Sequence, residues 1–290
     1  MLLRRRFSVI FLLPAGLLFA VFVLYPLVRG ILISFTNAIG PSGGQFNGLA
    51  NYFQLFRDPA AVGGLENTLI FTVVVVIVQT SAAVALAAWL FKFERLRNIV
   101  RASVLLPAMM ALVAVAFLWE FIYSPLGGPL DLVLNALGLQ GVEHTWLGDS
   151  STALMAIAFV YIWMYTGYSA TIFLANYVAI APSLFEAAKI DGARGWKRFR
   201  YIDWPLLAPS LTINVTLTVI GALRVFELPF IMTGGGPGNS TQTLGLEIYN
   251  ASFADYQFAY GTAIAVVLLI LTIIVGVGQA TLLRRREVDL

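Results

Sequence analysis

Residues 68–91 read TLIFTVVVVIVQTSAAVALAAWLF, and residues 92–101 read KFERLRNIVR. The first stretch holds no charged residue and is long enough to cross the hydrocarbon core of a bilayer as a helix. The second stretch carries four Lys and Arg residues. Basic clusters of this kind flank membrane spans on the cytoplasmic side. This part of the sequence therefore predicts a membrane protein and gives a first indication of its orientation.

The composition of the chain agrees with a protein that lies in lipid. Hydrophobic residues make up 59% and charged residues 11% of the 290 positions, whereas soluble domains have about 25% charged residues. In hydrocarbon a helix satisfies its own backbone hydrogen bonds, so we expect an all-α membrane protein. The absence of cysteine excludes disulfides and thiolate metal sites. The net charge of +3 gives no argument for a nucleic-acid partner.

Six apolar stretches are long enough to span the membrane. The first begins after three arginines, as a signal peptide does, but no small-residue cleavage site follows it, so we expect an uncleaved span. The loops between the spans are too short for a separate domain, and we expect one transmembrane domain over 1–290. The predicted spans are 7–35, 68–91, 100–123, 153–177, 206–231 and 261–283.

The basic residues alternate strictly between the predicted loops. Fifteen of the 18 Lys and Arg residues precede the first span, follow the last, or lie between spans two and three or four and five. The opposite loops hold only Arg57. The positive-inside rule then places both termini in the cytoplasm, with the chain across the cytoplasmic (inner) membrane.

The cytoplasmic loop over 178–205 has helical signals of its own. Ser183 followed by Glu186 fits a capping box, and Gly192 suits the end of a short helix. A second basic and aromatic turn is expected to end before Pro205. The residues alone leave two interpretations equally open: a helix that projects toward a partner protein, or an amphipathic segment that lies on anionic headgroups.

The same loop resembles the EAA loop of permease subunits in binding-protein-dependent ABC importers. The family pattern is Glu-Ala-Ala, three residues, Gly, nine residues, then Ile-x-Leu-Pro. Trp204 replaces the leucine of that pattern. The resemblance implies that this loop is a coupling helix that docks on the ATP-hydrolysing subunit. The residues that it assigns to coupling are Glu186, Ala187, Ala188, Asp191, Gly192, Ala193, Phe199, Ile202 and Pro205.

Other segments resemble the carbohydrate-uptake branch of that family, which is similar to the maltose and glycerol-3-phosphate permeases. The resemblance implies a type I ABC importer permease fold. The matching segments are Leu24-Tyr25-Pro26, Ser34-Phe35-Thr36, Trp119 to Gly128, Thr233 to Gly238 with Ser240-Thr241, and Tyr260-Gly261 with Ala263.

The resemblance also implies partners. They are a second, homologous permease subunit in a heterodimer, two ATP-binding subunits, an extracytoplasmic sugar-binding protein and the surrounding lipid. The sequence contains no Gly-x-x-x-x-Gly-Lys-Ser/Thr phosphate loop. We therefore expect no cofactor, metal or catalytic residue in this chain, and we expect Mg-ATP to bind the partner ATPases.

Polar residues within the spans are candidates for the substrate pathway. Tyr161, Tyr165 and Ser169 recur every four residues, and Asn214 lies in the fifth predicted span. Aromatic rings with polar edges suit sugars. The alternative is that these residues anchor helices at the membrane interface or join helices to one another.

Charged residues in the spans are further candidates, because buried charges in lipid usually pair or line water. Arg224 and Glu227 are three apart, so we expect them on one helix face. They could form an intrahelical ion pair or, equally, neutralise charges across a subunit interface, and a role at the outer gate is a further hypothesis. Arg29 and Glu120 lie near span ends and are expected to reach the interface.

Two other classes of function stay open at this level. A secondary, ion-coupled transporter would have carboxylates at the membrane midplane and often an internal repeat, and neither is visible. A membrane enzyme or scaffold would leave the EAA-like loop without a role, and the sequence contains no acid–base cluster, ligand set or nucleophile motif.

Overall fold

The structure is a computed structural model that describes residues 13–139 and 145–285. The beginning of the first predicted span and the single histidine, His144, lie outside the described residues. Nearly all of the described chain is helical, and extended pairing within it is limited to one isolated bridge between Thr36 and Phe46. The all-α prediction is confirmed.

Four helices are long and apolar enough to span a membrane. The first, Leu13–Ile33, includes a π-helical turn, η1 (Ala20–Leu24), and α2 (Tyr25–Ile33). The predicted spans at 68–91, 153–177 and 261–283 lie within the other three. These are α4 (Pro59–Lys92), α8 (Ala153–Ala179) and α15 (Phe258–Arg284).

The predicted span over 100–123 is not one continuous helix. The segment forms two helices, α5 (Glu94–Met109) and α6 (Leu112–Ile122), and the span bends by 97° between them. Pro107 lies in the last turn of α5 and cannot donate a backbone hydrogen bond. The backbone is extended at Met110 and Ala111, which separates the two helices.

The predicted span over 206–231 is also not one continuous helix. Helix α12 (Ala208–Leu223) ends eight residues early, and α13 (Glu227–Thr233) follows as a separate helix. The carbonyl of Val225, in the break, accepts a hydrogen bond of 3.0 Å from the Thr243 hydroxyl. The break is therefore stabilised by a segment that is distant in sequence.

The count of six spans holds when two bent pairs of helices are each counted as one span. One pair is the α5–α6 segment. The other joins Trp196–Leu206 to α12 with a bend of 70°. Short helices occupy parts of the predicted outer loops, namely α3 (Ala50–Leu55), α7 (Pro129–Ala136), α14 (Leu244–Tyr249) and the π turn η4 (Asn250–Ala254).

The chain forms two compact units, Met1–Val62 with Glu247–Leu269, and Gly63–Leu246 with Ile270–Leu290. Within the first unit, the loop after α2 is fixed by Asn51, whose side-chain amide donates to the carbonyls of Ser34 and Thr36 at 2.8 Å each. The Tyr260 hydroxyl donates to Asp58 at 2.7 Å, which holds the start of α15 against the start of α4.

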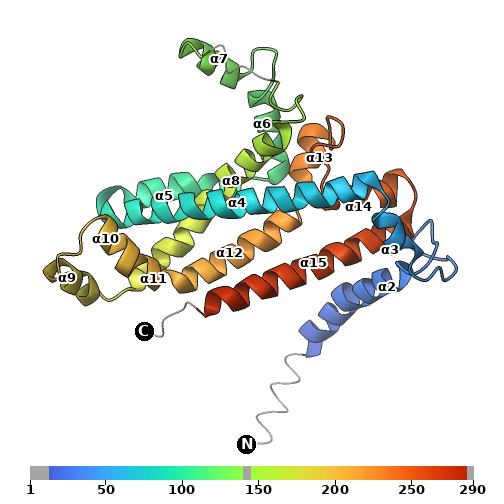
Figure 1. Ribbon diagram of the computed structural model, residues 1–290, viewed down its shortest axis with the longest axis horizontal. Coiled ribbons are helices and arrows are strands. Elements are labelled where there is room, and N and C mark those ends of the chain that lie inside the picture. Colours follow the sequence, from blue (N-terminus) through green and yellow to red (C-terminus); the bar gives the residue numbers. More distant parts are fainter. Residues whose placement is uncertain (1–12, 140–144, 286–290) are drawn as a thin grey trace, which may run out of the picture. The chain divides into compact units, whose positions relative to one another are not determined.

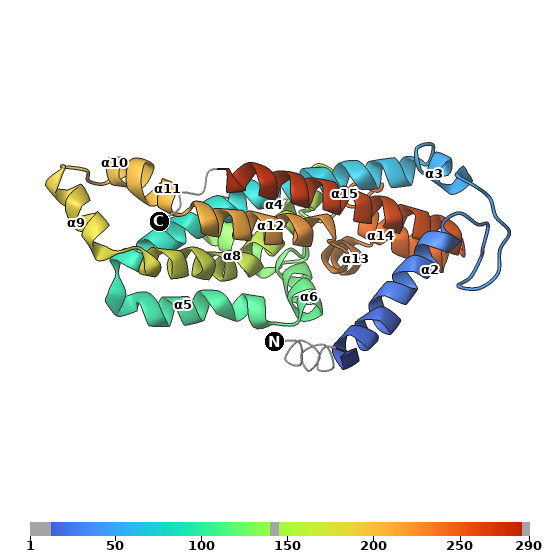
Figure 2. The same ribbon diagram turned by 90° about the horizontal axis from the view of Figure 1, so that it is seen from below.

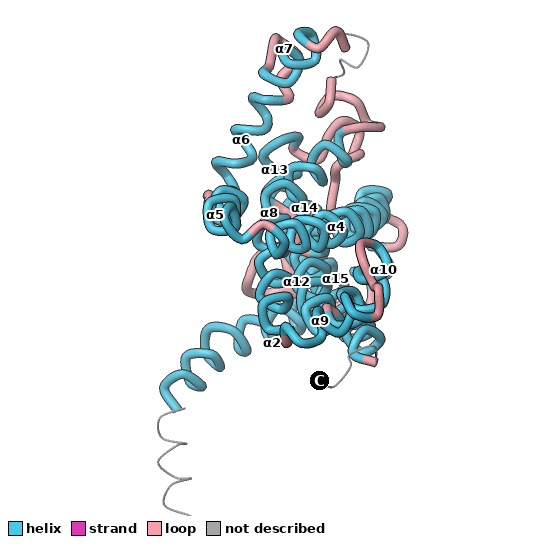
Figure 3. The backbone as a smooth tube through the Cα atoms, turned by 90° about the vertical axis from the view of Figure 1, so that its left-hand side faces the viewer, coloured by secondary structure: helices cyan, strands magenta, loops and turns pink. Residues whose placement is uncertain are grey.

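Helix α8 is the central helix of the second unit. It packs against α5, α12 and α13, and Figures 1 and 2 show α5, α8 and α12 side by side. In the view along the bundle, α8 lies between α5 and α4 (Figure 3). One hydrophobic core surrounds the first half of α8 and a second surrounds its last turns, from Ala170 to Ile180.

Gly167 allows α5 to approach α8 closely. A Cβ atom at this position would overlap the backbone carbonyl of Val104 on α5. Alanine normally stabilises a helix by about 1 kcal/mol more than glycine does. Overpacking, however, lowers the stability by about 1–3 kcal/mol. We therefore expect Gly167→Ala to lower the thermal stability of the purified protein.

The control is Gly278→Ala on α15, because a Cβ there would have no neighbour within 4 Å. We expect this variant to keep or raise the melting temperature in detergent. Equal melting temperatures for both variants would contradict the close packing of α5 on α8.

Candidate functional site

The segment between α8 and α12 forms two short helical parts at one end of the second unit (Figure 1). The first part is α9 (Pro182–Ile190). Its N-cap is Ala181, so the predicted capping box of Ser183 and Glu186 is wrong, and no side chain caps this end. Proline suits the first helical position because its fixed φ fits the helix and its missing N–H would lack a partner there. Pro182 thus sets the start of α9.

The C-terminal end of α9 is as predicted. Gly192 has a φ of +72°, which favours glycine. The backbone N–H of Ala193 donates to the Ala188 carbonyl at 2.8 Å, and that of Gly192 donates to the Lys189 carbonyl at 3.2 Å. These two bonds form a Schellman motif. The motif gives Ala188 and Ala193 a structural role beside any role in coupling.

The second part is one continuous helical stretch, composed of α10 (Trp196–Arg198), η3 (Phe199–Asp203) and α11 (Trp204–Leu206). The prediction that it ends before Pro205 is therefore wrong. Pro205 lies within the first two residues of α11, where its missing N–H is tolerated. The stretch ends at the bend that leads into α12.

A buried ion pair lies inside this second part. The Arg198 Nε atom is 3.2 Å from the nearer carboxylate oxygen of Asp203, and the Asp203 side chain is only 6% exposed. The two residues are five apart. A π-helix places residues at this spacing on one face, and η3 is π-helical. The π turn therefore allows the pair to form.

Aromatic rings join this ion pair to the membrane helices. The Arg198 guanidinium lies 5.0 Å from the ring centre of Phe185 on α9. The Phe185 ring is 5.4 Å from that of Phe91 on α4, which in turn stacks at 5.1 Å on Tyr177 of α8. We call the six residues Phe91, Tyr177, Phe185, Arg198, Phe199 and Asp203 the anchor cluster, since Phe199 packs against the same core.

The residues predicted for coupling fall into two sets. Glu186, Ala187, Asp191 and Gly192 are exposed. The others are buried or partly buried, and they are Ala188, Ala193, Phe199, Ile202 and Pro205. The first set presents a surface with two carboxylates, and of the second set Phe199 packs against the core that α4 and α8 form.

The candidates for the substrate pathway differ in their surroundings. Ser169 and Asn214 are buried and hydrogen-bonded between helices. The Gln79 side-chain amide donates to Ser169 at 2.8 Å, and Asn214 donates to Thr80 at 3.3 Å. Gln79 also donates to the Thr218 hydroxyl at 3.3 Å. These contacts are those expected of polar residues that join helices within a membrane.

Tyr161 and Tyr165 pack against one another on α8. The centres of their rings are 4.7 Å apart. A Cβ atom at Gly221 would lie 2.5 Å from the Tyr161 hydroxyl, so the small residue on α12 makes room for this ring. Tyr165 is half-buried and Glu227 is exposed.

The predicted intrahelical pair of Arg224 and Glu227 is not formed. Arg224 is the C-cap of α12, and Glu227 is the first residue of α13. The break between these helices separates the two side chains, and no ion pair joins them. The prediction assumed one continuous helix across this break.

Comparison with known proteins decides the family. Residues 79–288 match the model of the binding-protein-dependent transport system inner membrane component. The chain belongs to this family. The matched range contains the α9 segment, the anchor cluster and all candidate pathway residues.

Relatives align with the permease over nearly its whole length. The probable ABC transporter permease protein YurN of Bacillus subtilis is 34% identical over 274 residues, with 93% of both chains covered. The lactose transport system permease protein LacF of Rhizobium radiobacter is 34% identical over 292 residues, with 98% of this chain and 97% of LacF covered.

A solved structure shows the same fold. A bacterial ABC transporter involved in the import of the acidic polysaccharide alginate has a chain with a TM-score of 0.84 and 22% identity, and the alignment covers 97% of the permease and 96% of that chain. The predicted importer-permease fold is therefore confirmed, as is the location in the inner membrane.

Sequence reasoning missed several residues of the site. Gln79 and Thr80 interrupt an apolar run, and this interruption is a visible signal of a buried polar contact. Arg198 and Asp203 gave no such signal, because their spacing of five does not fit an α-helix face.

Proposed function

We propose that this permease subunit carries a sugar or sugar derivative into the cell and is coupled to separate ATP-hydrolysing subunits through residues 178–205. The main support is the construction of that segment. It presents Glu186 and Asp191 outward on α9, and the anchor cluster ties the same helix to α4 and α8. A movement of α9 would therefore move α4 and α8 as well.

The names of the relatives support a carbohydrate substrate. They include permeases for lactose, starch degradation products, arabinooligosaccharides and sulfoquinovosyl glycerol, at 30–34% identity. The solved importer is involved in the uptake of alginate. None of these names refers to an ion-coupled transporter, so the alternative of a secondary transporter has no support from the comparisons.

The proposed assembly contains a second, homologous permease, two ATPase subunits that bind Mg-ATP, and an extracytoplasmic sugar-binding protein. A related importer was crystallised with its substrate-loaded periplasmic protein. Both termini and α9 would face the cytoplasm, according to the distribution of basic residues. ATP would drive transport by favouring one of two conformations of the permease pair.

The test is uptake by the complete complex in proteoliposomes. The binding protein is first screened against a panel of di- and oligosaccharides, and the ligand found is then supplied in labelled form. We expect uptake that requires both ATP and the binding protein. A complex that co-purifies with no ATPase and hydrolyses no ATP would contradict the proposal.

Within this function, we expect Tyr165 to contact the substrate. Loss of one aromatic contact costs about 1 kcal/mol, so Tyr165→Ala should lower uptake at limiting substrate about fivefold. The measurement is initial uptake rate against concentration of the loaded binding protein, with assembly checked by gel filtration.

Tyr25→Ala is the control, because Tyr25 is an exposed ring on the first span. We expect this variant to transport normally. Normal uptake by Tyr165→Ala would show that Tyr165 does not contact the substrate. It would not contradict the proposed transport function.

A further inference from the structure

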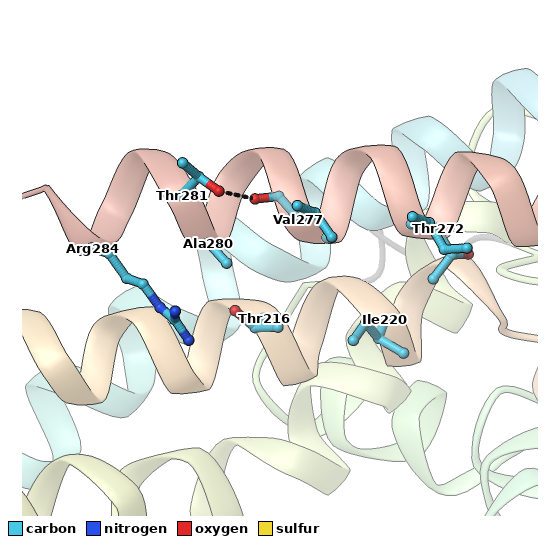
Figure 4. A pocket seen from close by; sticks show the side chains of 9 residues that line it. Thr216, Ile220, Thr272, Val277, Ala280, Thr281 and Arg284 are labelled. Carbon is cyan, nitrogen blue, oxygen red and sulfur yellow. Dashed lines mark hydrogen bonds between the residues drawn. The ribbon is translucent and has the colours of Figure 1, made fainter.

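An apolar groove of about 410 Å³ lies between α12 and the second half of α15. Thr216 and Ile220 line it from α12, and the residues that line it from α15 include Thr272, Gly276, Ala280 and Arg284. Figure 4 shows the two helices with these side chains between them. The groove takes no part in the coupling segment or in the Tyr161–Tyr165 region described above.

The length of the groove corresponds to one leaflet of a bilayer. From Thr272 to Arg284 the helix rises by 12 residues, which is about 18 Å at 1.5 Å per residue. Half of the hydrocarbon core of a bilayer is about 15 Å thick. Large apolar side chains on the same face of α15, Ile273 and Val277, are more than half exposed. The groove thus opens toward the surroundings of this unit and not into its core.

One end of the groove is basic. The Arg284 side chain extends from α15 toward α12 across the end of the groove (Figure 4). A second pocket of about 250 Å³ is lined by Leu283, the residue before Arg284, and by Arg200 and Trp204 of the α10–α11 stretch. The guanidinium group of Arg284 therefore lies at the end of an apolar groove, and Arg200 lines a neighbouring pocket.

The groove is held open by a hydrogen bond between its walls. The Gln279 side-chain amide donates to the Thr216 hydroxyl at 2.7 Å and to the Gly276 carbonyl at 3.2 Å. This contact fixes the distance between α12 and α15. Gly276 leaves space, since a Cβ atom there would meet only Ile220, at 3.9 Å.

We propose that this groove binds one anionic glycerophospholipid. An acyl chain lies along Gly276 and Ala280, and the phosphate group binds Arg284. Basic pockets between spanning helices select anionic headgroups, and the apolar length behind this arginine accommodates a hydrocarbon chain but not a free phosphate ion. This binding does not depend on the identity of the transported substrate.

Native mass spectrometry of the purified complex tests the proposal, with phosphatidylglycerol and phosphatidylcholine of identical acyl chains added in detergent. We expect the wild-type complex to retain phosphatidylglycerol about fivefold more than phosphatidylcholine, from about 1 kcal/mol per basic residue. Arg284→Gln should lose this preference, and Arg101→Gln, an exposed basic residue on α5 outside the groove, should keep it.

A second pair of variants tests the acyl-chain part of the site. Gly276→Leu fills the groove and should reduce the retention of both lipids. Gly278→Leu adds the same side chain to the same helix, at a position with no neighbour within 4 Å, and should leave retention unchanged. This pair also reports whether a leucine on α15 disturbs folding.

Three results would overturn the proposal. They are equal retention of the two lipids by the wild type, an unchanged preference in Arg284→Gln, and a photo-crosslink from Val277 to the second permease without bound lipid. The last result would make the groove a subunit interface. ATP-dependent uptake in any of these cases would show that the transport function stands without the lipid site.

Discussion

Arg198→Gln is expected to abolish coupled uptake while the complex still hydrolyses ATP. The substitution leaves the buried Asp203 carboxylate without its ion-pair partner and removes the cation above the Phe185 ring. Loss of one member of a buried pair costs about 3–5 kcal/mol. Because the Arg198 side chain is 31% exposed, we expect this substitution to lower the stability by only about 2 kcal/mol. The α10–α11 stretch would then no longer hold α9 in place.

The measurement compares ATP hydrolysis and labelled-substrate uptake in the same proteoliposomes. Lys197→Gln is the matched control, because Lys197 is the exposed neighbour of Arg198. The double variant Arg198→Gln with Asp203→Asn replaces the pair by two neutral groups and should restore part of the uptake. Uptake at the wild-type level in Arg198→Gln would show that the ion pair has no part in coupling.

Phe185→Ala is expected to have a similarly large effect by a different route. The Phe185 ring contacts the Phe91 ring on α4 and lies beneath Arg198. Full burial of a phenylalanine would make its loss cost about 3–5 kcal/mol. Since this ring is only partly buried, we expect its loss to lower the stability by about 2 kcal/mol. Helix α9 would keep its fold, through Pro182 and the Schellman motif, but lose its attachment to α4.

Limited proteolysis of the purified complex measures this detachment, beside uptake and ATP hydrolysis. We expect faster cleavage within the α9 segment and loss of uptake. Phe185→Leu keeps an apolar contact and should retain most of the transport, which separates packing from any direct contact with an ATPase. Unchanged proteolysis and uptake in Phe185→Ala would contradict the role of the anchor cluster.

The sequence allowed the continuous spans to be predicted well. Helices α4, α8 and α15 contain long, mainly apolar runs without a charged residue, and such runs leave no other stable structure in lipid. The two broken segments could not be predicted in the same way. The residues around Met110 are as apolar as their neighbours, so hydropathy does not change where α5 ends. Arg224 and Glu227 flank Val225, but their spacing of three also fits one face of a continuous helix, so they did not indicate the break. The break at Val225 also depends on Thr243, a contact that only the fold creates.

In the candidate site, too, local features could be predicted from the sequence and contacts between distant segments could not. Gly192 was predicted because a helix end with positive φ is a local feature. The capping box was wrong because two local signals competed, and the proline at position 182 determined the start of α9. The anchor cluster brings together residues from α4, α8, α9 and the α10–α11 stretch. Its ion pair needs a π turn, which no simple spacing rule indicates.

The central claim, that α9 docks on an ATPase subunit, can be tested most directly by a site-specific crosslink. The chain has no cysteine, so a single cysteine can be introduced at Ile190, which is 87% exposed at the end of α9. Leu126→Cys, at a 94% exposed position between α6 and α7, is the control. With a short bifunctional maleimide–amine reagent, we predict an adduct with the ATPase subunit from Ile190→Cys, with a yield that changes on ATP binding, and none from Leu126→Cys. No adduct from Ile190→Cys in an assembled, ATP-hydrolysing complex, or an adduct only from Leu126→Cys, would contradict the account.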